Sequence, residues 1–145
     1  MACPYFFPIQ KTHTIAWSFP QRLPLGAGFC GTCRTGQEEF VPDDATLRDS
    51  CNLGHALACA RMPAARRADS VRFAVATDTG ERIALHYVYD RDHAPVEHGQ
   101  LEYDCKAGHW ITTLADVCVQ RQAECYLQIY LERRRGSRSG DLAIG

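Results

Sequence analysis

The chain has 145 residues, of which 46% are hydrophobic and 23% are charged, and its 16 basic and 17 acidic side chains give a formal charge of −1. This length fits one domain of ordinary size, and 11 glycines and 7 prolines are too few for a collagen-like or low-complexity chain. Proteins that bind nucleic acid by phosphate attraction are more basic, and no apolar run approaches the ~20 residues of a membrane-spanning helix. We therefore expect neither nucleic-acid nor membrane binding.

The first 41 residues are apolar but show no helical or strand period. Prolines interrupt them at Pro4, Pro8, Pro20 and Pro24, and glycines follow at 26, 28, 31 and 36. A segment this hydrophobic must pack onto something. We predict that residues 1–65 form a loop-rich segment organised by a metal centre or by the neighbouring residues.

One or two short helices are expected within this segment, after Pro42. Asp43 or Asp44 can cap the first one, which runs through Leu47 towards Cys51. Residues 52–54 then offer a break, and a second short helix is expected over 55–60, ended by a proline at position 63.

From residue 70 onwards the period of the hydrophobic side chains is two, which predicts half-buried strands. We expect strands over 71–76, 83–89, 101–103 and 109–113, with a longer loop over 90–99. A helical period over 115–134 predicts a final helix that Gly136 can stop, followed by a flexible tail over 136–145. The predicted class is α+β: an antiparallel β-meander covered by a C-terminal helix over 66–135, packed as one domain with the N-terminal segment.

The positions of the eight cysteines indicate which of them could bind a metal. The start of the sequence has no basic region and no uninterrupted apolar run, so we expect no secretory signal and a cytoplasmic location, where structural disulfides are rare. Cys118 and Cys125 fit the core face of the last helix, and Cys105 fits a turn. The other five fall within the first 59 residues, at Cys3, Cys30, Cys33, Cys51 and Cys59.

These five cysteines supply enough sulfur ligands for a metal centre. Cys30 and Cys33 form a C-x-x-C, which we place on a glycine-rich loop. On one straight helix Cys51 and Cys59 would stand ~12 Å apart, whereas thiolates that share one zinc lie only about 4 Å apart. Either the helix breaks at Gly54 or a larger cluster spans the gap, so we expect an iron–sulfur cluster, [4Fe–4S], with zinc as the alternative. His55 lies one helical turn from both Cys51 and Cys59 and is an alternate ligand, although a surface histidine explains it more simply.

The Cys-Pro-Tyr-Phe start at 3–6, Gly-Thr-Cys at 31–33 and Cys-Asn-Leu-Gly-His-Ala-Leu-Ala-Cys at 51–59 resemble a family of small bacterial cysteine-rich proteins with no assigned activity. Those proteins share the Cys-Pro-Tyr-Phe start and a Cys-Asn-Leu-Gly-Tyr-Ala segment that ends in Cys-Pro. This chain has His55 in place of the tyrosine and Ala60 in place of the proline, which leaves the 51–60 segment an incomplete match. The resemblance implies that Cys3, Cys33, Cys51 and Cys59 are the ligands and that Cys30 is the spare.

Other functions use the same residues. A thiol–disulfide oxidoreductase would use Cys30 and Cys33, but such a motif follows a buried strand and opens a helix, and we expect neither at this place. The loop over 90–99 holds acidic and histidine side chains without a known ligand spacing, so we expect it to be solvated. A structural zinc site in an interaction module, with an unidentified protein partner, is a further alternative. We assign no catalytic residue and favour a non-enzymatic protein.

Overall fold

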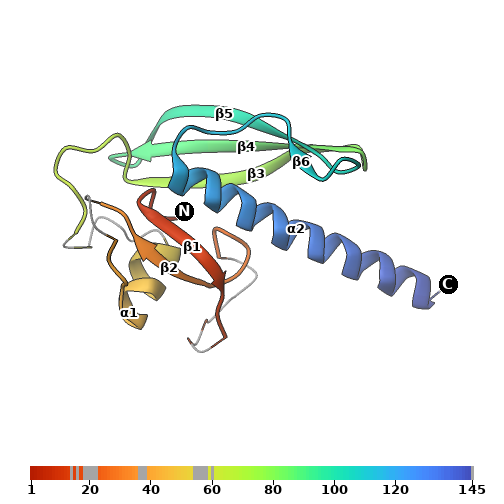
Figure 1. The fold of residues 1–145 in the computed structure, drawn as a ribbon, viewed down its shortest axis with the longest axis horizontal. Helices are drawn as coiled ribbons and strands as arrows, with labels where there is room; N and C mark the ends of the chain where they lie inside the picture. Colours follow the sequence, from red (N-terminus) through yellow and green to blue (C-terminus); the bar gives the residue numbers. More distant parts are fainter. Residues whose placement is uncertain are drawn as a thin grey trace.

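The structure, a computed structural model, describes residues 1–13, 15, 17, 23–35, 39–53, 59 and 61–144. Its elements, in chain order, are β1 (Phe6–Lys11), β2 (Phe29–Cys33), α1 (Asp44–Thr46), the π-helical turn η2 (Leu47–Asn52), β3 (Ser70–Asp78), β4 (Arg82–Arg91), β5 (Ala94–Asp104), β6 (His109–Trp110) and α2 (Val117–Ile144). Figure 1 shows α2 along the underside of one sheet, with β1 and β2 below that sheet at one end. The predicted α+β class is confirmed.

The second half of the chain is the predicted antiparallel meander. Its sheet has the order β3-β4-β5-β6, and each strand pairs antiparallel with the one before it. The loop predicted over 90–99 is wrong: β4 and β5 run almost to each other and are joined by Asp92 and His93, whose φ angles are 52° and 64°. Two consecutive residues with positive φ make the tight turn that fits the strand twist. The first half of β5 is exposed, so it lacks the apolar alternation that would have predicted a strand.

The C-terminal helix is longer than predicted. Gly136, the predicted stop, lies inside α2, and the helix continues to Ile144 in place of the expected flexible tail. A glycine inside a helix costs only about 1 kcal/mol relative to alanine, which a helix can tolerate. Among the described residues, no helix combines the length and apolar content needed to cross a membrane.

The N-terminal segment contains a two-stranded sheet that its sequence does not indicate. β1 and β2 pair antiparallel with Phe6 opposite Cys33, and the register shifts between Pro8 and Gln10. Proline has no N–H to donate to a β-ladder, so Pro8 argues against a strand in the sequence. The structure tolerates it because β1 is at the edge of its sheet. Gly31 lies against β1 so closely that an added Cβ would stand 2.1 Å from the carbonyl oxygen of Phe7.

The helix predicted after Pro42 is confirmed. Asp43 caps it, since its carboxylate accepts a 2.8 Å hydrogen bond from the backbone N–H of Thr46. The helix continues as η2 and ends at Asn52, which agrees with the predicted break over 52–54. Gly54, His55 and most of the second short helix predicted over 55–60 lie outside the described residues.

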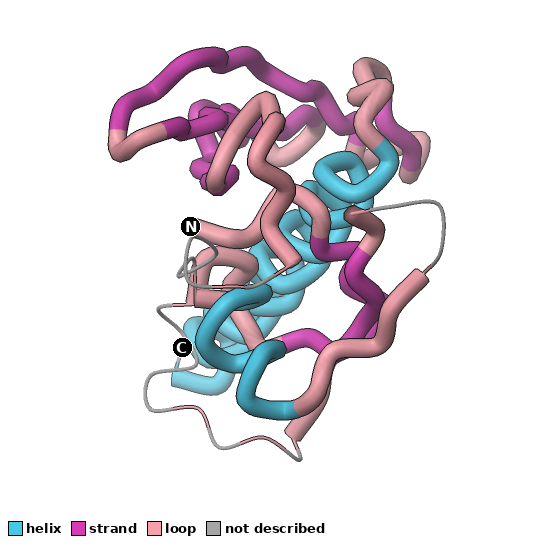
Figure 2. The backbone as a smooth tube through the Cα atoms, turned by 90° about the vertical axis from the view of Figure 1, so that its left-hand side faces the viewer, coloured by secondary structure: helices cyan, strands magenta, loops and turns pink. Residues whose placement is uncertain are grey.

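One hydrophobic core joins both halves of the chain. It contains Phe6 and Phe29 from the small sheet, Val71 and Tyr89 from the large sheet, and residues of α2 such as Val119. Figure 2 shows the large sheet above, with both α2 and the N-terminal segment below it, and Ala2 pairs directly with Val71 of the sheet. The N-terminal segment thus packs directly on the meander and its helix.

Candidate metal centre

Four cysteines from four separate segments line one cavity. Cys3 precedes β1, Cys33 ends β2, Cys51 lies in η2, and Cys59 lies in the segment that leads to β3. The cavity measures about 20 Å³, enough for one water-sized sphere. Its other lining residues are Phe6, Thr35, Phe40, Pro42, Thr46, Ser50, Arg61 and Met62.

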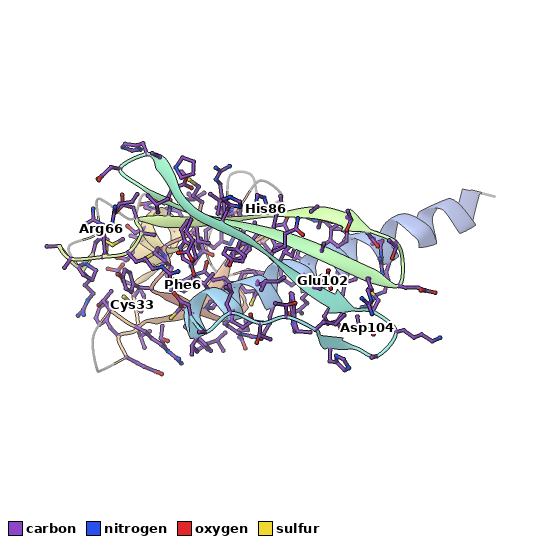
Figure 3. The ribbon with its side chains drawn as sticks, turned by 90° about the horizontal axis from the view of Figure 1, so that it is seen from above. Phe6, Cys33, Arg66, His86, Glu102 and Asp104 are labelled. Atoms are coloured by element: carbon purple, nitrogen blue, oxygen red, sulfur yellow. The ribbon has the colours of Figure 1, made fainter. Side chains whose placement is uncertain are left out.

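Backbone hydrogen bonds bring three of these cysteines together. The N–H of Cys3 donates to the carbonyl of Cys51 (3.2 Å), and the N–H of Arg34, next to Cys33, donates to the carbonyl of Tyr5 (2.9 Å). Figure 3 labels Cys33 beside Phe6, its partner in the β1–β2 register. The turn that carries Cys3 is therefore tied to both Cys51 and the end of β2.

Asn52 joins η2 to β2 and so places Cys51 beside the small sheet. Its side chain, 1% exposed, donates to the carbonyls of Leu47 (2.7 Å) and Phe29 (3.0 Å). Its carbonyl oxygen accepts from the N–H of Phe29 (3.1 Å). The side-chain amide of Asn52 thus pairs with both backbone groups of Phe29, as a neighbouring strand would.

α2 supports the turn that carries Cys3 from the other side. The fully buried Gln122 donates hydrogen bonds to the carbonyls of Cys3 (2.7 Å) and Phe6 (2.8 Å). One turn earlier on the helix, the Sγ atom of Cys118 lies 3.7 Å from the carbonyl oxygen of Tyr5. Residues more than 110 positions away along the chain therefore hold this turn in place.

Burial favours the protonated form of two of these thiols, those of Cys3 and Cys51. Burial raises the pKa of Cys3 to about 12, although a hydrogen bond from the backbone of Tyr5 opposes the shift, and the nearby sulfurs of Cys33, Cys59 and Cys118 add to it. Burial likewise raises the pKa of Cys51, and Cys3, Cys33 and Cys59 again contribute. A thiol must lose its proton to bind a metal, so metal binding here must release protons.

The four thiols share a cavity without forming a finished ligand set. Within the part of the chain that the structure describes, no three side chains of His, Cys, Asp or Glu stand together at metal-ligand positions. Binding one ion through all four sulfurs would therefore require the cysteine side chains to turn towards each other.

Cys30 is not part of this group. It lies in β2 and does not line the cavity, and its thiol donates to the carbonyl of Gln10 (3.5 Å). The loop predicted for Cys30 and Cys33 is wrong, because both residues belong to one extended strand. Positions three apart in a strand are about 10 Å apart and face opposite sides, which is too far for a disulfide without backbone movement.

The remaining predicted positions have different outcomes. His55, the alternate ligand, lies outside the described residues. Cys105 lies in the turn before β6, and Cys125 is buried in the core, as predicted. Cys118 is buried on α2, as predicted. The contacts of Cys118 and Gln122 with the Cys3 turn were not predicted, because the helical period assigns both residues only to a core face.

No family model, curated protein or solved structure matches this chain. The resemblance to small bacterial cysteine-rich proteins therefore stays a prediction, and the site rests on its own geometry.

Proposed function

We propose that this chain is a cytoplasmic metal-binding protein with a metal centre held by Cys3, Cys33, Cys51 and Cys59. The observation that supports it is that these four cysteines, spread over 57 positions of the sequence, line one cavity while Cys30 does not. The centre would cross-link four segments within the N-terminal part of the chain, with a structural, electron-transfer or redox-sensing role. The proposal assigns no catalytic residue.

A [4Fe–4S] cluster is the preferred occupant. Four cysteine thiolates are the usual ligands of such clusters, and the lining residues that the structure describes include no histidine or carboxylate. Phe6, Phe40, Pro42 and Met62 supply an apolar wall of the kind that shields a cluster from water and influences its potential. The four thiols come from four segments, so the ligands can spread around a cluster larger than one ion.

A zinc ion is the second candidate. A cavity of about 20 Å³ suits a single ion better than a cluster. Four thiolates at about 2.3 Å from the metal form a closed structural zinc site, which contributes its binding energy to folding. In this case the protein would be a zinc-stabilised interaction module.

Metal analysis of protein purified without oxygen tests the proposal. We expect brown protein that contains iron and sulfide, and we expect the Cys51→Ala variant to lose both. Cys125→Ala removes an equally buried thiol outside the cavity, and Cys30→Ala removes the spare one, so both should keep the metal.

The outcomes separate the candidates. Colourless protein with one equivalent of zinc, lost on Cys51→Ala, would replace the cluster by zinc. Metal-free protein after reconstitution with iron and sulfide and, separately, with zinc would overturn both versions. Metal loss in Cys30→Ala equal to that in Cys51→Ala would overturn the assignment of the ligands.

A further inference from the structure

The outer face of the large sheet carries two histidines that the proposed centre does not use. Leu85 of β4 and Leu101 of β5 pack on Ala123 of α2, which identifies the inner face. Successive side chains of a strand alternate between faces. His86 and His98 therefore belong to the outer face, the side from which Figure 3 views the sheet and where His86 is labelled.

The two histidines are diagonal neighbours on adjacent strands. His86 pairs with Gln100 in the β4–β5 ladder, and His98 stands two positions from Gln100 on the same face. Their ring centroids are 5.7 Å apart and their planes are inclined at 70°. Two imidazoles bound to one tetrahedral ion through bonds of about 2.0–2.1 Å have centroids about 5 Å apart, so small side-chain rotations bring these rings to that distance.

The surroundings leave this pair open to a cation. Ala74 stands opposite His86 on β3, so the residue paired with His86 on that strand has no large side chain to cover the ring. Arg72 is the basic residue of β3 two positions before Ala74. Its Nε atom donates a 3.1 Å hydrogen bond to the carboxylate of Asp90. Gln100 and Glu102 are exposed on the same face and present oxygen atoms beside the histidines.

We propose that His86 and His98 form a second metal site, separate from the cysteine centre, for a divalent transition ion such as Zn²⁺, Ni²⁺ or Cu²⁺. Imidazole is a preferred ligand of these ions, and water completes the coordination of an exposed two-histidine site. The ion would bridge β4 and β5 and so stabilise that hairpin. Because the ligands come from a different sheet, this site does not depend on the cysteine centre.

Nickel titration of the untagged full-length protein, purified with its own metal content, tests this site. Ni²⁺ is paramagnetic, so we expect selective broadening of the NMR signals of the His86 and His98 rings, together with a rise in melting temperature. His98→Gln should weaken nickel binding at least tenfold. The matched control His109→Gln, on the exposed end of β6, should leave the affinity unchanged.

Three results would overturn the site. One is nickel affinity in His98→Gln equal to that of the wild type, with circular dichroism showing both folded. Another is equal broadening of all histidine rings, which indicates non-specific binding. The third is nickel binding that disappears in Cys51→Ala but not in His98→Gln, which would assign the ion to the cysteines.

Discussion

The side chain of Asn52 makes three buried hydrogen bonds near the cavity. Its amide pairs with two carbonyls and one N–H of the backbone, and all three hydrogen bonds are buried. We expect Asn52→Leu to lower the free energy of unfolding by about 2–3 kcal/mol, because buried polar groups are left without partners. Urea denaturation measures the change.

Gln100→Leu provides the matched control for this prediction. It replaces the same amide by the same side chain on an exposed strand position, so its effect should stay within about 0.5 kcal/mol. Equal losses in the two variants would show that the hydrogen bonds of Asn52 do not matter for stability.

Gln122 acts on the proposed centre through Cys3. Its two hydrogen bonds hold the carbonyls on either side of the Cys3 turn. In Gln122→Leu we expect a chelator to remove the metal several-fold faster, since the turn that carries one ligand is released. Gln128→Leu removes an exposed amide from the same helix and should leave the rate of metal removal unchanged. Faster release in both variants, or in neither, would contradict a positioning role of Gln122.

Residue patterns predicted part of the site. The crowding of five thiols into the first 59 residues pointed to this segment, and the resemblance named the four cysteines that line the cavity. Neither pattern could reveal Gln122 or Cys118, because their roles arise from contacts with a turn more than 110 residues away. Sequence spacing carries no information about such contacts.

The β1–β2 pair depends on a close approach at Gly31. A methyl group there would stand 2.1 Å from the carbonyl oxygen of Phe7, which is backbone and cannot turn away. We expect Gly31→Ala to cost about 3 kcal/mol or more in the free energy of unfolding, because the strands must separate. Separation would also move Cys33, so metal content should fall together with stability.

Gly80→Ala is the control for this substitution. Its φ is +86° and an added Cβ meets no atom within 4 Å, so only the strain of the left-handed conformation remains, roughly 1 kcal/mol. Metal content should be unaffected. Equal losses at the two glycines would contradict the close approach at Gly31.

Elements with a clear hydrophobic period were predicted well, and those without one were not. The strands over 71–76 and 83–89 and the final helix each bury one face, so their period is visible. β1 and the first half of β5 are exposed or contain proline, and their backbone pairing leaves no periodic trace. The end of α2 was missed because a glycine permits a helix end without requiring one.

At the scale of the whole molecule, Asp78 connects the large sheet to α2. Its carboxylate accepts hydrogen bonds from Tyr130 (2.7 Å) and from Arg134 (2.9 Å), both on the helix. The hydrogen bond from Tyr130, aided by the N–H of Gly80 and by Arg134, lowers the pKa of Asp78 to about 2.

The pKa of Asp78 predicts a loss of stability in acid. An unfolded aspartate titrates near 3.9, so this connection contributes fully above about pH 4 and loses its contribution as the pH falls towards 2. We expect Asp78→Asn to be less stable than the wild type at pH 6 and to approach it by pH 2. Thermal unfolding across this range tests the prediction, and a constant difference between the two proteins would contradict it.

The sequence by itself determined the α+β class, the meander, the capped helix after Pro42 and the segment that holds the candidate ligands. These features are local, because side-chain period and capping are set by neighbours along the chain. Only the tertiary structure decided that Cys3, Cys33, Cys51 and Cys59 share a cavity, that Cys30 faces away from it, and that α2 supports the Cys3 turn. Those arrangements depend on the β1–β2 register and on packing between distant segments, which no local pattern encodes.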